Sequence, residues 1–296
     1  MIKSDGFSKN DVRTIGLAMA FATLGLLLRL LLGTLLDIEI SKLAASVLNF
    51  LLAGLAALYL LPKRLKEPFG KVDLTEYTRR LGFYLPRGAW RHVVLGLVLA
   101  SCTLGGMLIG SVLTGRYELD WSTVNISHSV FSLNPGVWEE FFYRGIIMAV
   151  LLKHTKSVRQ ATFIQVLLFA LAHIKGFDLW AWVDVISVLI IALAFTYAAY
   201  KTRTLIAGIV FHFVHDALLY LVLVPGAKYA GFAENAVFYV TLWIMVGVAC
   251  LLTKVAAEKL GVQARTELYQ VEQDLGQESS PQDIQIASPG SFATNR

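Results

Sequence analysis

The sequence predicts an all-α fold: a polytopic integral membrane helical bundle with about eight transmembrane helices. Of its 296 residues, 56% are hydrophobic and only 16% are charged, against roughly 25% charged residues in soluble domains. The apolar residues form blocks of about 17–25 residues, the length with which a helix crosses a bilayer. Lysines and arginines collect between alternate blocks, which is typical of the cytoplasmic loops of membrane proteins.

We expect eight helices, over residues 12–36, 44–61, 93–113, 135–153, 158–174, 180–200, 204–224 and 236–253. The first is too long for the core of a signal peptide, so we interpret it as a retained anchor. Asn134 and Pro135 are typical of an N-cap and the first helical position of the fourth helix. Ser157 begins a capping-box pattern at the start of the fifth. Gly176 and Pro225 are expected to end the fifth and seventh helices.

The basic residues between the helices predict the topology. Segment 62–91 is rich in lysine and arginine, so it should be cytoplasmic, which places both termini in the cytoplasm. This segment either includes a stretch that lies along the membrane interface or is a plain charged loop. The chain then divides into a cytoplasmic N-terminal segment (1–11), a transmembrane domain (12–260) and a C-terminal tail (261–296). The tail is polar and is expected to be disordered.

The charge and the cysteines exclude several classes of protein. The net charge of +5 comes from basic residues in the loops, where membrane topology puts them, so we expect no nucleic-acid partner. The lipid bilayer is the expected surrounding. The only cysteines, Cys102 and Cys250, lie far apart in apolar blocks. They form neither a disulfide framework nor a zinc-binding cluster.

Two adjacent glutamates, Glu139 and Glu140, interrupt the fourth apolar block, and Arg144 follows. A charge at the membrane centre costs roughly 2.5–3.5 kcal/mol, whereas a large apolar side chain contributes only about 0.3–0.6 kcal/mol. The charges must therefore be paired, protonated or turned toward a protein interior. An acid four residues before a base forms a favourable helical pair, so we expect Glu140 to pair with Arg144. Glu139, rotated by about 100° on an α-helix, is then the candidate general base. A purely structural Glu–Arg pair is the alternative.

Three further polar residues lie in the later helices: His173, His212 and Asp216. His212 and Asp216 are four residues apart and share a helix face, while His215 is rotated off that face. Taken singly, His173 fits an interfacial residue, and His212 with Asp216 fits a hydrogen-bonded clasp between helices. Together with Glu139 in one polar cavity, they would form a constellation suited to hydrolysis.

These residues resemble the CAAX prenyl endopeptidase type II family, also described as CAAX proteases and bacteriocin-processing enzymes (CPBP or Abi proteins). The family pattern is Glu-Glu-x-x-x-Arg, then Phe-x-x-x-His, then His-x-x-x-Asn or Asp, on successive membrane helices. The chain carries these motifs in order as Glu139–Arg144, Phe169–His173 and His212–Asp216. The resemblance covers about residues 80–260.

The resemblance implies an intramembrane endopeptidase that cleaves a membrane-associated or lipidated peptide, in a bacterial-type plasma membrane. Glu139 and His173 would activate a water for attack on a peptide carbonyl. His212 and Asp216 would stabilise the oxyanion, and Glu140 with its arginine would support them.

The residues leave the cofactor open. Glu139, His173, His212 and Asp216 could equally hold a divalent metal such as zinc, because carboxylate and imidazole suit several ions. The His-Glu-x-x-His pattern that favours zinc is not in the sequence. Asp216 stands where the best-studied branch of the family has Asn, and an ionised carboxylate would repel an oxyanion. Asp216 would have to be protonated, paired with a histidine, or a metal ligand.

Two other functions fit the same polar residues. An immunity or scaffold protein would bind a peptide or partner through the cavity without cleaving it. A proton-coupled transporter would use the acids and histidines as a relay, but the sequence has no internal repeat of the kind such transporters contain. The predicted topology puts Glu139 and His173 in helix halves away from the cytoplasm. A substrate must then reach a deep site from the cytoplasm, or be a membrane peptide of another kind.

Overall fold

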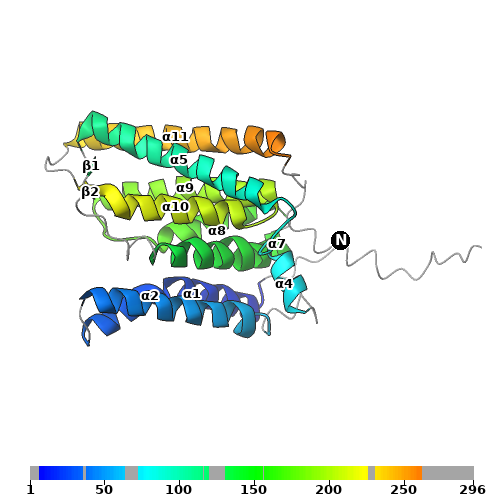
Figure 1. Cartoon of the computed structure of the whole chain (residues 1–296). Coiled ribbons are helices and arrows are strands. Elements are labelled where there is room, and N and C mark those ends of the chain that lie inside the picture. Colours follow the sequence, from blue (N-terminus) through cyan, green and yellow to red (C-terminus); the bar gives the residue numbers. More distant parts are fainter. Residues whose placement is uncertain are drawn as a thin grey trace, which may run out of the picture.

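The computed structural model of the chain describes residues 7–35, 38–63, 73–115, 117–119, 131–155, 157–225 and 231–261. Residues 1–6 and 262–296 lie outside these ranges, and with them almost all of the predicted disordered tail. The described residues form a bundle of long helices (Figure 1).

The helices lie in three layers (Figure 1). The first layer is a hairpin of α1 (Lys9–Gly33) and α2 (Ile38–Leu55), which η1 (Ala56–Leu60) extends. The middle layer holds η3 (Pro135–Ile147), α7 (Met148–Thr155), α8 (Val158–Leu171), α9 (Leu179–Thr202) and α10 (Ile206–Val222). The third layer is α5 (Ala89–Thr114) packed along α11 (Phe232–Lys259).

Each of the eight predicted helices corresponds to a helical segment, but the structure does not test that all eight cross a membrane. Among the described residues, four segments are long and apolar enough to do so: Leu43–Leu60, Ala89–Thr114, Leu179–Thr202 and Phe232–Lys259. Val158–Leu171 and Ile206–Leu218 are apolar but shorter. The chain is thus a helical integral membrane protein, and the count of eight stays a prediction.

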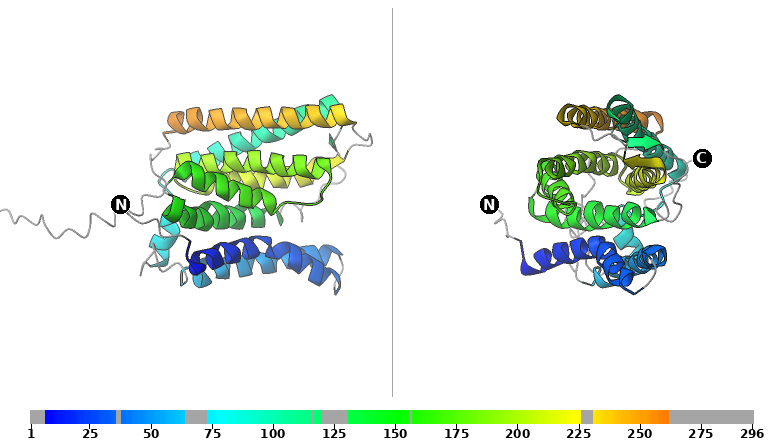
Figure 2. Two further views of the ribbon diagram at one scale, coloured as in Figure 1. Left: turned by 180° about the vertical axis from the view of Figure 1, so that it is seen from behind. Right: turned by 90° about the vertical axis from the view of Figure 1, so that its left-hand side faces the viewer.

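The start of α1 and the end of α11 lie at the same end of the bundle, as does the short helix α4 (Leu74–Arg80) (Figure 2). At the opposite end, β1 (Tyr117–Leu119) and β2 (Leu223–Pro225) form a small antiparallel sheet, which the sequence analysis did not predict. In its register, Glu118 lies opposite Val224. The sheet joins the ends of α5 and α10.

The helix α4 lies within the segment for which an interfacial stretch was considered, although residues 64–72 are outside the described part of the chain. The Tyr77 hydroxyl donates to the Ala57 carbonyl over 3.1 Å and docks α4 on η1. On its polar face, hydrogen bonds from Arg79 and Arg80 lower the pKa of Glu76 to about 2. The helix therefore has one docked side and one charged side.

The fourth predicted helix differs from expectation in its geometry. Pro135–Ile147 is a π-helix, with hydrogen bonds between residues five apart, and only Met148–Thr155 is α-helical. A glycine on each of the two helices allows η3 and α10 to pack closely. A Cβ at Gly136 would lie 2.9 Å from Phe213 Cβ, and one at Gly208 would lie 2.9 Å from Glu140 Oε2. The wider helical turn changes which side chains face α10, so the 100° rotation expected between the two glutamates does not apply.

Two apolar clusters flank the centre of the bundle. One surrounds η3 and α7 and includes Phe141, Phe142 and Phe169. The other lies between α5, α9, α10 and α11 and includes Phe195 and Phe211. The polar residues of the three motifs lie between these clusters, where apolar packing from both sides holds their side chains in place.

Candidate active site

One carboxylate oxygen of Glu140 is bonded to two other side chains, those of Arg144 and His212, at the centre of the bundle. Arg144 Nη1 lies 3.0 Å from Glu140 Oε1, the pair that their spacing predicts. His212 Nδ1 lies 2.9 Å from the same oxygen. Because a carboxylate only accepts hydrogen bonds, both nitrogens donate to it. Glu140 thus connects η3 to α10 as well as to its own arginine.

The arginine is fully buried and is held on several sides. Its Nε donates to Thr196 Oγ1 and its Nη2 to the Ala192 carbonyl, each over 3.4 Å. Its guanidinium lies 4.2 Å from the centre of the Phe169 ring, a favourable position for a cation over an aromatic face. Buried charges are tolerated when paired and hydrogen-bonded, and the partners of Arg144 meet this condition.

The ring of His212 is fixed by the bond to Glu140 and by stacking. Its centre is 4.7 Å from that of Phe195, with the ring planes 19° apart. The other nitrogen, Nε2, faces two acids: it is 3.5 Å from Asp216 Oδ2 and 3.9 Å from Glu139 Oε2. His212 therefore lies between three carboxylates, one at Nδ1 and two at Nε2.

His173 lies just after the end of α8 rather than within it. The last carbonyls of a helix lack partners in the helix itself, and His173 Nδ1 donates to one of them, Phe169 O, over 2.8 Å. This bond turns His173 Nε2 toward Glu139, whose Oε2 is 4.0 Å away. In the neutral ring Nε2 is then the acceptor.

Glu139 is the least committed acid of the group. Its Oε2 is buried and has no hydrogen-bond partner among the described residues. The two nearest ring nitrogens, of His173 and His212, are 4.0 and 3.9 Å away, too far for direct hydrogen bonds. A water at about 2.6–3.2 Å from both Glu139 and His173 fits this spacing.

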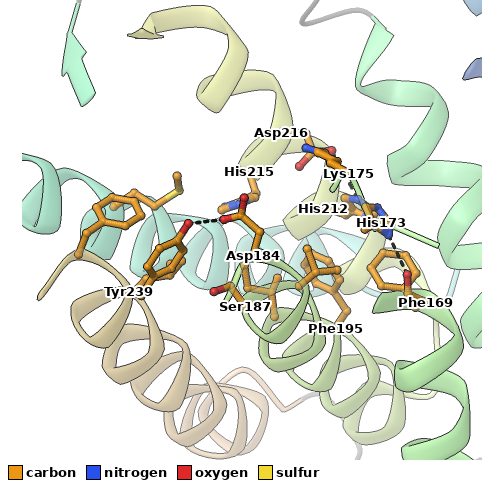
Figure 3. Close-up of a pocket in the computed structure, with 15 residues that line it drawn as sticks. Phe169, His173, Lys175, Asp184, Ser187, Phe195, His212, His215, Asp216 and Tyr239 are labelled. Atoms are coloured by element: carbon orange, nitrogen blue, oxygen red, sulfur yellow. Dashed lines mark hydrogen bonds and ion pairs between the residues drawn. The ribbon is translucent and has the colours of Figure 1, made fainter. Parts of the chain in front are cut away.

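Two cavities meet at these residues. One, of about 260 Å³, lies between α5, α9, α10 and α11 and is lined by His173, His212 and Asp216. Figure 3 shows its polar side, where the Tyr239 hydroxyl donates to Asp184. The other, of about 360 Å³, lies between α1, α2, η3 and the end of α8 and is lined by Glu139, His173 and Asp216. The acids and His173 thus separate two spaces large enough for substrate side chains.

The structure brings together Glu139, Glu140, Arg144, His173, His212 and Asp216. The sequence did not predict the bond between His212 and Glu140, since the two residues are distant in the chain. Lys175, which lines both cavities, was also not predicted, nor was Gln165, which accepts from Thr196 Oγ1 over 2.9 Å behind the arginine. A polar residue in the middle of an apolar helix was the available signal for Gln165.

The side chains of the site do not have the arrangement of metal ligands. Over the described ranges, no group of three or more His, Cys, Asp or Glu side chains is placed to hold a metal ion. His212 and Glu139 are 3.9 Å apart at their nearest atoms, wider than the roughly 3.3 Å edge of a tetrahedron with 2.0–2.1 Å ligand bonds. The arrangement does not fit a metal site, and no step below passes through one.

Part of the chain matches a known protein family. Residues 121–218 match the family model described as type II CAAX prenyl endopeptidase Rce1-like. No match was found among curated proteins or among solved structures. The matched segment contains every site residue named above, from Glu139 to Asp216. Residues 121–218 are therefore identified as an Rce1-like type II CAAX prenyl endopeptidase domain, which confirms the family suggested by the motifs.

Proposed function

We propose that the chain is an intramembrane endopeptidase that hydrolyses a peptide bond in a membrane-associated or lipidated peptide. The observation that carries the proposal is the buried, unpartnered Oε2 of Glu139, 4.0 Å from His173 Nε2 and at the junction of two cavities. The Rce1-like domain supports the same reaction class.

In the proposed reaction, a water donates one hydrogen bond to Glu139 and one to His173 Nε2. Glu139 takes the water's proton as the oxygen attacks the carbonyl carbon, which forms a tetrahedral oxyanion. Protonated Glu139 then gives this proton to the departing amine, the C–N bond breaks, and the carboxylate is restored. His173, held by the Phe169 carbonyl, orients the water.

His212 is the proposed oxyanion donor. With one N–H on Glu140 and a second at Nε2, the ring donates to the developing negative charge, the interaction that contributes most when the donor is pre-positioned. Asp216, whose Oδ2 is 3.5 Å from Nε2, then accepts from the ring nitrogen, holds the ring in place and does not act on the oxyanion directly. This assignment accommodates an acid at the position where the best-studied branch of the family has Asn. Glu140 and Arg144 are positioning residues.

The proposed location is a bacterial-type plasma membrane, with both termini in the cytoplasm. The start of α1, helix α4 and the end of α11 lie at the same end of the bundle (Figure 2). This arrangement supports the placement of both termini on the same side of the membrane.

The test uses the full chain in lipid vesicles and two internally quenched peptides. One ends in a prenylated Cys followed by two aliphatic residues and a C-terminal residue, and the other is identical but unprenylated. Glu139→Gln should lower kcat by about 10²–10⁴-fold, the typical contribution of a general base. Glu258→Gln, an acid exposed near the end of α11, is the matched control and should cleave normally.

The alternative role as an immunity or scaffold protein makes the opposite prediction. Glu139→Gln keeps the shape of the side chain and removes the base, so a binding function would survive it. Cleavage by Glu139→Gln at the wild-type rate, with normal amounts of folded protein, would overturn the proposed mechanism.

A further inference from the structure

The larger cavity has a polar wall that the proposed mechanism does not use. It is formed by Asn49 of α2 and by Trp138 and Tyr143 of η3, which line the cavity together with Glu139. All three side chains of this wall are buried, with 4%, 6% and 1% of their surface exposed, in that order. They approach the cavity from the side of the α1–α2 hairpin and from the helix that carries the general base.

Each of the three residues has a polar atom without a partner. Asn49 Oδ1, Trp138 Nε1 and Tyr143 Oη are buried and make no hydrogen bond to the described residues. A buried polar group without a partner is destabilising, and such groups are rare in native proteins. Three of them around one cavity, beside an unpartnered catalytic acid, indicate a ligand that supplies the missing partners.

The chemistry of these atoms matches a peptide backbone. An indole N–H only donates, a phenol donates or accepts, and an amide side chain does both. An extended peptide offers carbonyls and N–H groups in alternation along its length. At membrane depth these groups have no water to bond with, so each needs a protein partner. The main-chain groups of the substrate and the polar atoms of the wall both lack hydrogen-bond partners, and each group provides partners for the other.

The wall is held in place before any substrate binds. The Trp138 ring packs against Phe50 and Phe83, with ring centres 5.2 and 6.3 Å apart. Gly54 allows this position, because a Cβ there would lie 3.1 Å from the indole. Gly25 in α1 similarly makes room for the Asn49 amide, whose Nδ2 would be 2.7 Å from an added Cβ. Fixed donors and acceptors lose little entropy on binding.

We propose that Asn49, Trp138 and Tyr143 form a subsite that binds the main chain of the substrate next to the scissile bond. The inference rests on the proposed endopeptidase function and adds to it the residues that hold an unwound peptide beside Glu139. Recognition of the main chain makes the subsite tolerant of substrate side chains, so it contributes to KM for many peptides alike.

The first test removes each polar atom with a small change of shape. Trp138→Phe, Asn49→Leu and Tyr143→Phe are compared with Trp182→Phe, whose indole is exposed on α9. With the prenylated quenched peptide, each wall variant should raise KM by about 3- to 10-fold, the effect of one lost hydrogen bond, with kcat within about 2-fold. Trp182→Phe should match the wild type. A fall in kcat at unchanged KM, or KM values equal to the control, would overturn the assignment.

The second test compares peptides on a protein whose wall is intact, so misfolding of a wall variant cannot obscure its main result. Binding of a fluorescent copy of the prenylated peptide to Glu139→Gln protein is followed by anisotropy, with ester linkages replacing single amides near the cleavage site. One ester, which removes one N–H, should weaken binding about 3- to 10-fold. In the Asn49→Leu background that ester should cause no further loss.

The outcomes separate the two proposals. Equal binding of all ester and amide peptides would show that the wall holds only water and would overturn the subsite, while loss of cleavage in Glu139→Gln would still support the endopeptidase. Failure of the peptide to bind at all would overturn the subsite as well. Main-chain-dependent binding without any cleavage by the wild type would support the subsite and refute the endopeptidase.

Discussion

Replacing Arg144 by methionine should destabilise the protein far more than an equivalent change at the surface. Arg144 and Glu140 are both fully buried and 3.0 Å apart. Removing one member of a buried pair typically costs about 3–5 kcal/mol, and here it leaves Glu140 with His212 as its remaining partner. The guanidinium's contacts with Thr196, Ala192 and the Phe169 ring are lost as well. We therefore expect a loss of at least about 3 kcal/mol.

The chain offers a matched control in Arg79→Met. Arg79 pairs with Glu76 at 2.6 Å, but its side chain is 53% exposed, and exposed pairs contribute only about 0–1 kcal/mol. The free energy of unfolding would be measured by denaturant titration in detergent micelles. The double variant Glu140→Gln with Arg144→Met removes both charges and should be more stable than Arg144→Met alone. If Arg144→Met were no more destabilising than Arg79→Met, the buried pair would not be the structural centre described above.

Three further predictions concern the site. Asp216→Asn should retain activity within about 10-fold, because an amide can still bond to His212, whereas Asp216→Ala should lose about 10²–10³-fold in activity. Equal losses for the two variants in quenched-peptide cleavage would contradict this role of Asp216. Gly208→Ala should lower stability by about 1–3 kcal/mol and should also lower kcat, because the added Cβ would displace Glu140. Gly105→Ala, with open space around it, should lower neither. Equal unfolding midpoints for the two variants would argue against the contact between Gly208 and Glu140. A divalent-metal chelator should leave the cleavage rate unchanged, and loss restored specifically by added zinc would contradict the geometry found here.

The spacing of residues along the sequence predicted a side-chain contact within one helix but not the contacts between helices. Glu140 and Arg144 pair as their separation of four residues indicates, because they belong to the same helix. The bond from His212 to Glu140 joins residues 72 positions apart, and no periodicity encodes the packing of η3 on α10. The motif resemblance, by contrast, named the residues that meet there.

The π-helix could not be predicted because every rotation was worked out for an α-helix. The wider turn depends on tertiary contacts, with Gly136 against Phe213 and Gly208 against Glu140, that sequence patterns do not report. The cavity wall of Asn49, Trp138 and Tyr143 was also not foreseen. Aromatic and amide residues in apolar helices are common, and only their lack of partners in the folded chain distinguishes these.

The shared oxygen of Glu140 has a consequence for how the protein is made. Arg144 pairs within its own helix, so this acid and base neutralise each other as soon as η3 forms. His212 is synthesised later and reaches Glu140 only after α10 has packed against η3. The Nδ1–Oε1 bond therefore forms only after the chain has been made as far as α10, and His212 and Asp216 join Glu139 in the same step. A nascent chain stopped before α10 would hold the Glu140–Arg144 pair without His212 and Asp216.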